Sequence, residues 1–596
     1  MTTPGAQPLY FGSEQRSLFG WLHAPSESRA APDSGIVLCN PFGYEALCVH
    51  RTFRRFAEQA AEAGLAALRF DYDGTGDSAG DDYEAGRLEA WIASVNQAVE
   101  ALKARTKVRR VFLAGMRLGA TLAAIAAVER NDIAGLIAIA PVVKGRGFVR
   151  ELRALALARP QPTPPEWARV NTDLQESAGF GLTTQTQKSL QEIDLATMSR
   201  APAQVLLLER DDMPRNDAWG AHLHSLGVHV QRKTFAGHAA MISSPHEHVV
   251  PEAMLQDAIA WLNEQVANDR HSPAAVDTAP MRQSSFPADN VRESIARPDA
   301  ESRLFAILTE PSVHNGAALA PRSVVLMLNA GAISRIGPGR LYVALARTLA
   351  QQGHAVLRLD ISGIGDSRPH RGEPDNSVYT DRAQSDIEEA MKYLRRRFGD
   401  TPVHAVGICS GAYHLFKAAV AGLPFQTAIV INPLTFFWKE GMSLAEPEFQ
   451  TASEMTRYRS RALKLSAWLK LLRGGVSVRD FVRVFRSRVL VAARHRARDV
   501  ARRLGISVDD DLARELHQAV QRTQCLLFIF SEHDPGITLL REQGGSAVDC
   551  LQRRNRIQLE VIAAADHTFT AHWARDRLID LLLAHLNAGS IESAAA

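Results

Sequence analysis

The chain has 596 residues, of which 46% are hydrophobic and 22% charged, as is typical of soluble globular proteins. It is too long for a single hydrophobic core, and its length predicts roughly two to four domains. The formal net charge of +3 is small for this size and gives no global reason to expect binding to nucleic acid or to a membrane.

The cysteines favour a reducing compartment, and the N-terminus does not resemble a signal peptide. The chain has five cysteines, an odd number, and their spacing is neither that of a disulfide framework nor that of a zinc site. The N-terminus lacks the basic segment and apolar run of a signal peptide, and no stretch reaches about 18 consecutive apolar residues. We therefore expect a cytoplasmic protein without a transmembrane segment. The cysteines are Cys39, Cys48, Cys409, Cys525 and Cys550.

Short apolar runs alternate with Ala-rich helical patterns along both halves, which predicts parallel strands connected by helices. Such alternation favours α/β architecture, in which helices cover both faces of a mostly parallel, doubly wound sheet. Helical patterns include 53–63 and 340–352. The strand candidates are 35–39, 66–70, 111–114, 135–140 and 205–208, then 323–328, 355–359, 404–406, 428–431 and 526–530.

The two halves also resemble each other, and the matches keep their order, which indicates an internal duplication. The stretch AGH ending at His238 recurs as ADH ending at His567. Three longer matches precede it: RFDYDGTGDS (69–78) recurs as RLDISGIGDS (358–367), GMRLGA (115–120) as GICSGA (407–412), and IAPVV (139–143) as INPLT (431–435).

The predicted organisation is a first domain at 1–267, a linker at 268–290 and a second domain at 291–588. The linker is polar and rich in Pro, Ser and Ala, and we expect the tail GSIESAAA to be disordered. The second domain is longer because of a helical cap at about 436–522. Within this cap, residues 456–503 contain 15 Lys or Arg and only 2 Asp or Glu.

The second half carries a complete set of residues for nucleophilic catalysis. GICSG follows a strand and precedes a helix, as in a nucleophile elbow, where Gly407 and Gly411 permit a tight turn around Cys409. Asp534 follows a later strand and His567 precedes the last helix. We expect His567 to take the thiol proton and Asp534 to orient the imidazole.

The same half offers donors for an oxyanion hole. These are the backbone N–H of Ser410 and an N–H of the loop NAGA, from Ala330 or Gly331. Ser410 itself is an alternative nucleophile, although it lies one position from the apex of the turn. The other alternative is that Cys409 is a small buried residue without chemistry.

Both halves resemble α/β-hydrolases, and more narrowly the serine-aminopeptidase-like branch, through the D-x-x-G-x-G-x-S stretches at 71–78 and 360–367 and through the elbows. GMRLGAT and GICSGAYH are also similar to hydrolases found with bacterial exopolysaccharide and exosortase systems. The resemblance implies two tandem α/β-hydrolase domains and action on an ester, thioester or amide. Cysteine at the second elbow, where most relatives have serine, resembles the dienelactone hydrolases.

The first half departs further from this pattern because Arg117 stands at its elbow, and arginine stays protonated in proteins. Asp211, with Asp212 as an alternative, and His238 stand where the acid and base are expected. Either Arg117 pairs with Asp211 and fills the old pocket, or its guanidinium binds a carboxylate or phosphate of a ligand. Both readings make this half a degenerate domain.

The sequence thus predicts an acyl hydrolase or acyltransferase with a small-molecule or carrier-bound acyl substrate. The basic cap is either a solvated face or a site for an anionic substrate or membrane surface. Arg479, Arg483 and Arg486 follow helical spacing in it. No histidine has metal-ligand spacing and no glycine-rich stretch fits a nucleotide loop, so we expect no metal and no cofactor. The basic cap lacks the aromatic-basic motif of a known module, so we expect no nucleic acid. The rival hypotheses are a non-catalytic binding protein and an effector pocket at Arg117 that regulates the second half.

Overall fold

The computed structural model describes residues 6–25, 33–158, 163–164, 167, 174–214, 217–267, 283–286, 291–312, 320–439, 442 and 510–594. Most of the predicted cap, including Arg479, Arg483 and Arg486, lies outside these residues.

Eight strands of the first repeat (residues 1–267) form one sheet in the order β1-β2-β4-β3-β5-β6-β9-β10. The first two strands form an antiparallel pair, and β2 is antiparallel to β4. All pairs from β4 to β10 are parallel. The strands are β1 (Ala6–Gly12), β2 (Ser17–His23), β3 (Ser34–Cys39), β4 (Ala66–Phe70), β5 (Arg110–Met116), β6 (Ile133–Ile139), β9 (Gln204–Arg210) and β10 (His229–Phe235).

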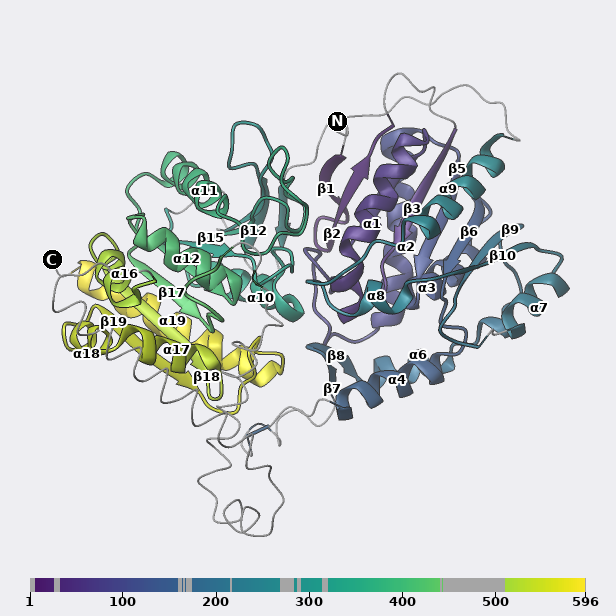
Figure 1. Ribbon diagram of the computed structural model, residues 1–596. Coiled ribbons are helices and arrows are strands. Elements are labelled where there is room, and N and C mark those ends of the chain that lie inside the picture. Colours follow the sequence, from purple (N-terminus) through teal and green to yellow (C-terminus); the bar gives the residue numbers. More distant parts are fainter. Residues whose placement is uncertain are drawn as a thin grey trace, which may run out of the picture. The chain divides into compact units, whose positions relative to one another are not determined.

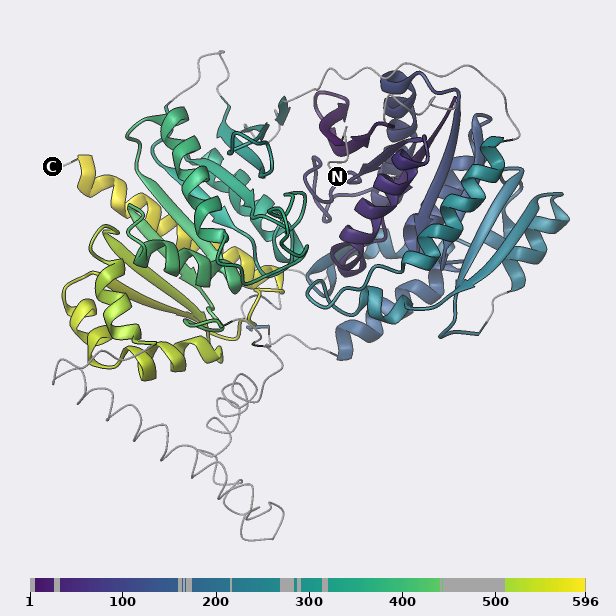
Figure 2. The same ribbon diagram turned by 45° about the horizontal axis from the view of Figure 1, so that its top comes forward.

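Helices cover both faces of this sheet because its central strands are apolar on both sides. Figures 1 and 2 show α1 and α9 on the same side, and both contribute to one apolar cluster. The opposite cluster takes residues from α2, α3 and α4. The remaining elements include the hairpin of β7 (Leu174–Ser177) and β8 (Phe180–Thr183). The helices are α1 (Tyr44–Glu62), α2 (Arg87–Thr106), α3 (Leu118–Val128), α4 (Gly145–Ala158), α6 (Thr184–Glu192), η1 (Leu195–Thr197), α7 (Asp217–Ser225), α8 (His238–Ile242) and α9 (Glu252–Ala267).

The second repeat (residues 291–588) has the same plan, and its sheet has the strand order β11-β12-β13-β15-β14-β16-β17-β18-β19. β11, β12, β13 and β15 pair antiparallel, whereas the pairs from β14 through β16, β17 and β18 to β19 are parallel. The strands are β11 (Gln283–Phe286), β12 (Val291–Ala296), β13 (Phe305–Pro311), β14 (Val324–Leu328), β15 (Ala355–Asp360), β16 (Val403–Ile408), β17 (Thr427–Ile431), β18 (Cys525–Ser531) and β19 (Ile557–Ile562).

The helices of the second repeat alternate with these strands, and α12 packs on β16 and β17. They are η3 (Pro338–Arg340), α10 (Leu341–Gln351), α11 (Ala383–Phe398), α12 (Ser410–Val420), α16 (Leu512–Ala519), α17 (Pro535–Gly544), α18 (Ser546–Arg553) and α19 (His572–Ala594).

The predicted fold class, two tandem doubly wound α/β sheets, is confirmed. The antiparallel strands at the start of each repeat were not predicted. The segment predicted as a linker contains a strand, β11, which pairs with β12. The prediction of a disordered tail is wrong as far as Ala594, because α19 continues to that residue.

The chain divides into two compact units, whose boundaries differ from those of the repeats. The first unit comprises residues 1–321, 332–376 and 571–573, and the second comprises 322–331, 377–570 and 574–596. The first unit thus contains the elbow of the first repeat. The elbow of the second repeat, with Asp534 and His567, belongs entirely to the second unit.

Candidate active site

Cys409 occupies the apex of a tight turn between β16 and α12. Its backbone has φ 59° and ψ −116°, a region that residues with a side chain rarely adopt. The turn is closely packed: a Cβ atom added at Gly407 would lie 2.2 Å from the carbonyl oxygen of Gly411, and one at Gly411 would lie 2.4 Å from that of Asn329. Only glycine fits at both positions, which explains the sequence around the elbow.

The structure brings Asp534 and His567 together. Asp534 lies after β18 at the start of α17, where its Oδ1 accepts a hydrogen bond from the Gly536 N–H (2.9 Å). Its Oδ2 lies 2.6 Å from Nδ1 of His567, in the loop after β19. The Asp534 side chain is fully buried, so its carboxylate has little competition from water for this hydrogen bond.

The electrostatics of His567 depend on both neighbours. Burial opposes its positive charge, but the hydrogen bond with Asp534 and the interaction with Cys409 outweigh burial and raise the pKa of His567 well above its usual value. Nε2 of His567 is buried and forms no hydrogen bond of ordinary geometry with the described residues. Cys409 is thus close enough to raise the pKa of His567, although its thiol forms no hydrogen bond of ordinary geometry with Nε2.

The loop after β14 carries the predicted oxyanion donors. The N–H of Gly331 donates to Oγ of Ser410 at 2.9 Å, so this donor is already engaged. Ala330 precedes it and is buried beside the elbow. Ser410 begins α12, where the first N–H groups of a helix have no partner within the helix.

Asn432 braces the loops of the acid and the base, and it was not predicted from the sequence. Its Nδ2 donates to the carbonyl of His567 (2.7 Å), and its Oδ1 accepts from the N–H of Ser531 (2.8 Å). The residue follows β17 with φ 47°. The only signal in the sequence is the difference between INPLT and IAPVV, which puts Ala140 at the corresponding position of the first repeat.

Tyr379 is the second residue that the sequence did not indicate. Its ring stacks on Trp438, with ring centroids 4.1 Å apart and an interplanar angle of 13°. Burial, and then the nearby Cys409 and Tyr413, raise the pKa of Tyr379 well above its usual value. Its hydroxyl has no hydrogen-bond partner among the described residues. An unpaired hydroxyl thus lies in the surroundings of Cys409.

The first repeat has kept the shape of the elbow without a nucleophile. Arg117 has φ 53° and ψ −121°, close to the angles of Cys409. Its guanidinium donates to Glu45 (2.9 Å) and to Glu151. The predicted alternative in which Arg117 pairs with Asp211 is therefore wrong, because Glu45 in the first turn of α1 and Glu151 on α4 satisfy the guanidinium instead.

The acid and base candidates of the first repeat do not meet. Asp211 is exposed, and Asp212 pairs with the neighbouring Arg210. Neither ring nitrogen of His238 has a hydrogen-bond partner among the described residues. Burial, and then the charges of Arg210 and Arg117, lower the pKa of His238 to about 4. The arrangement found around His567 is thus missing around His238.

A family of known proteins matches each of the two repeats separately. The sequence model of the serine aminopeptidase (S33) family matches residues 32–256 and 321–526, most of the chain. The chain belongs to this family. Both repeats are therefore α/β-hydrolase domains, and the chain is a hydrolase by family. The second match ends before Asp534 and His567, so the pairing of these two residues rests on geometry alone.

Several solved structures are similar to the chain over about the length of one repeat. They include Est1E from Butyrivibrio proteoclasticus with bound ferulic acid, at 20% identity and a TM-score of 0.35, covering 44% of this chain and 99% of that one. Proline iminopeptidase from Mycobacterium smegmatis has 15% identity and a TM-score of 0.33, covering 44% of this chain and 100% of that one. No curated protein matches the chain.

The described residues contain no group of three His, Cys, Asp or Glu side chains that could hold a metal ion. None of their helices has the length and apolar character needed to cross a membrane.

Proposed function

We propose that the chain is an acyl hydrolase or acyltransferase that acts on esters, thioesters or amides through Cys409, His567 and Asp534. The observation that carries the proposal is the 2.6 Å contact between His567 and Asp534, beside a cysteine at the apex of a strained elbow. In this arrangement Asp534 fixes the imidazole so that Nε2 faces the thiol.

The raised pKa of His567 suits a cysteine better than a serine. A protonated imidazole stabilises a neighbouring thiolate, which is the nucleophilic form of cysteine. The thiolate sulfur attacks the acyl carbon, the bond from that carbon to the leaving group breaks, and the leaving group takes the proton from His567. Water or another acceptor then gives its proton to His567 and attacks the acyl carbon of the thioester, whose C–S bond breaks, and this regenerates the thiolate and the protonated imidazole.

The oxyanion hole is proposed to consist of the N–H groups of Ser410 and Ala330. Gly331, the third candidate, already donates to the Ser410 hydroxyl. The same bond argues against Ser410 as the nucleophile, because its oxygen is held toward the Gly331 loop. The N-terminal end of α12 adds its partial positive charge at the position where the oxyanion forms.

The first repeat is proposed to be catalytically inactive, since Arg117 is held by two carboxylates and His238 has no acid partner. The carrier-bound or anionic nature of the substrate stays a proposal from the basic cap. A reducing, cytoplasmic setting is also proposed, because all five cysteines are free.

The test is acylation of the full chain by S-phenyl thioacetate, followed by intact mass and peptide mapping. We expect one transient acetyl group on Cys409, and a His567→Ala variant that acylates at least about 100-fold more slowly. Cys39 and Cys48 are internal controls, because burial raises the pKa of each to about 12. Turnover that survives Cys409→Ala would contradict the proposal. Binding of the thioester without acylation would favour a non-catalytic binding protein.

A further inference from the structure

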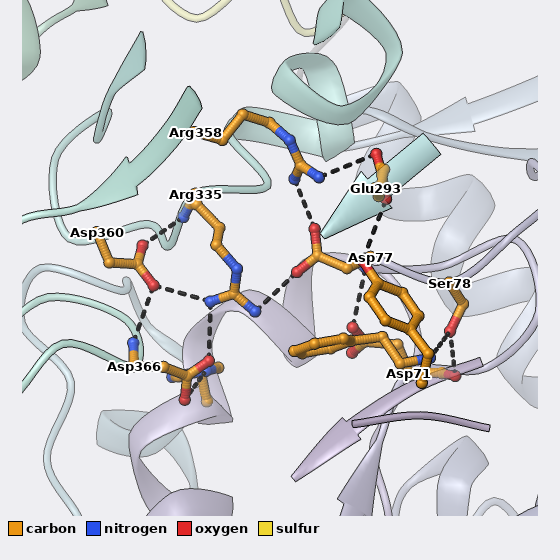
Figure 3. Close-up of polar contacts among 12 residues, drawn as sticks. Asp71, Asp77, Ser78, Glu293, Arg335, Arg358, Asp360 and Asp366 are labelled. Carbon is orange, nitrogen blue, oxygen red and sulfur yellow. Dashed lines mark hydrogen bonds and ion pairs between the residues drawn. The ribbon is translucent and has the colours of Figure 1, made fainter. Parts of the chain in front are cut away.

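Two equivalent aspartates, one in each repeat, have different surroundings. Asp360 of the second repeat corresponds to Asp71 of the first, because each opens a D-x-x-G-x-G-x-S stretch. Asp360 is fully satisfied: it accepts the N–H of Arg335 (2.6 Å), the guanidinium of Arg335 (2.8 Å) and the N–H of Asp366 (3.0 Å). Figure 3 shows Arg335 lying between Asp360, Asp366 and Asp77.

Asp71 has no equivalent of this arginine. Asn40 and Asn329 precede the two aspartates by the same number of residues, so Ala46 corresponds to Arg335. Oδ2 of Asp71 accepts the N–H of Asp77 (2.9 Å), the counterpart of the Asp366 bond. Its Oδ1 accepts no hydrogen bond within the part of the chain that the structure describes. One side of the carboxylate is thus unpaired.

The neighbouring ion pairs leave no spare cation for Asp71. Four guanidinium groups and four other carboxylates of the first unit pair with one another in a buried network. Figure 3 labels two of these arginines, Arg335 and Arg358, and all four carboxylates. Asp71 forms no direct ion pair with any member of that network, although the nearby charge of Arg335 partly lowers its pKa. Burial, and then the charge of Asp77, raise its pKa to about 7. The network consists of Arg69, Arg335, Arg347, Arg358, Asp77, Glu293, Asp360 and Asp366.

A cavity of about 100 Å³ borders this unpaired carboxylate. One water molecule needs about 10–15 Å³, so the space holds several waters or a small organic group. Ala46 also lines it, and the short Ala46 side chain leaves open the space into which an arginine would extend. Most of the remaining wall is apolar or aromatic and includes Phe42, Phe70, Tyr72, Trp91 and Phe180. Arg69 and Arg335 also line the cavity, and their charges are paired with Asp366 and with Asp77 and Asp366, which line it as well.

We infer that this cavity binds a small organic cation, in which a guanidinium, amidinium or primary ammonium group on an apolar body pairs with Asp71 as Arg335 pairs with Asp360. A planar amidinium matches the two oxygens of a carboxylate in the same way as an arginine side chain. Aromatic rings attract cations and supply apolar contact for the ligand body. The site is separate from Cys409 and does not depend on the proposed catalytic function.

The test compares benzamidine with the neutral, nearly isosteric benzamide by calorimetric titration of the full chain at pH 8. We expect one benzamidine per chain, with benzamide binding at least about tenfold more weakly. Asp71→Asn keeps an oxygen for the Asp77 N–H and is expected to remove this preference. Asp217→Asn is the control, because Asp217 lies on α7, is exposed and pairs with Arg232 of β10.

A tethered guanidinium gives an independent check. Ala46→Arg is expected to abolish benzamidine binding and to raise the melting temperature without ligand, as an arginine there would pair with Asp71. Equal affinity for benzamidine and benzamide, or full benzamidine binding by Asp71→Asn, would overturn the inference. So would unchanged benzamidine binding by a folded Ala46→Arg variant. Acylation of Cys409 is expected to be unaffected in Asp71→Asn, which separates this test from that of the proposed function.

Discussion

Replacement of Asn432 by glycine tests whether the acid and base loops depend on one buried side chain. The change removes both backbone contacts of Asn432 and leaves the Ser531 N–H and the His567 carbonyl without their partner. A buried polar group that loses its partner costs about 1–3 kcal/mol. Because the His567 contact is only partly buried, we expect a loss of about 2–4 kcal/mol in the free energy of unfolding.

Comparison of two substitutions isolates the backbone contribution. Asn432 has φ 47°, which glycine adopts without strain but alanine does not. Asn432→Ala should therefore be about 1–2 kcal/mol less stable than Asn432→Gly. Asn555 is a matched control, since it also has a positive φ (54°) but is exposed and has no side-chain hydrogen bond among the described residues. Asn555→Gly is expected to change stability by only a few tenths of a kcal/mol.

The assays are urea unfolding of each variant and the rate at which Cys409 is acylated by S-phenyl thioacetate. We expect Asn432→Gly to lower both, because the His567 loop is no longer held beside the elbow. A variant with the stability and acylation rate of the parent would refute the bracing role. Lower stability with an unchanged rate would show that Asn432 supports the fold but does not position His567.

Three further predictions concern single groups. Tyr379→Phe removes an unpaired hydroxyl near Cys409. The melting temperature is expected to stay the same or rise, because the hydroxyl has no partner to lose. A severalfold fall in the acylation rate would show that the hydroxyl contacts the acyl group. The pKa of His567 is raised in the folded protein, so protonation of His567 stabilises the fold. This contribution to the free energy of unfolding is complete below the unfolded pKa of about 6.5 and is lost as pH rises through the folded pKa. Cys409→Ala should lower the His567 pKa measured by NMR. The pKa of Asp71 is raised to about 7, so unfolding should become easier as pH rises from about 4 to 7, and Asp71→Asn should remove this slope in urea unfolding across pH.

Local sequence signals were sufficient for the parallel core and the elbow. β4 was predicted to the residue, because a short apolar run bounded by turn residues favours a strand. Gly407 and Gly411 indicated the elbow because the close backbone approach excludes every other residue. Cys409, Asp534 and His567 were predicted as a set because their order and their places after strands follow the hydrolase pattern, and the structure pairs Asp534 with His567.

The parts that were missed depend on contacts distant in sequence. β12 contains Glu293, which reads as a surface residue, yet it is buried because Arg347 and Arg358 pair with it. Arg117 pairs with Glu45 and Glu151 rather than with the acid candidate, and no local pattern specifies those partners.

The two elbows separate backbone geometry from chemistry. Arg117 and Cys409 have nearly the same apex angles although only one of them can act as a nucleophile, so the strained turn does not require a nucleophile at its apex. Its origin lies in the junction itself, since a Cβ atom at Gly119 would lie 2.2 Å from the carbonyl oxygen of Asn40, as one at Gly411 would crowd Asn329. The backbone conformation at the apex is therefore set by the close packing of the turn and not by the side chain that it carries. Substitution of the apex residue is expected to leave the turn unchanged.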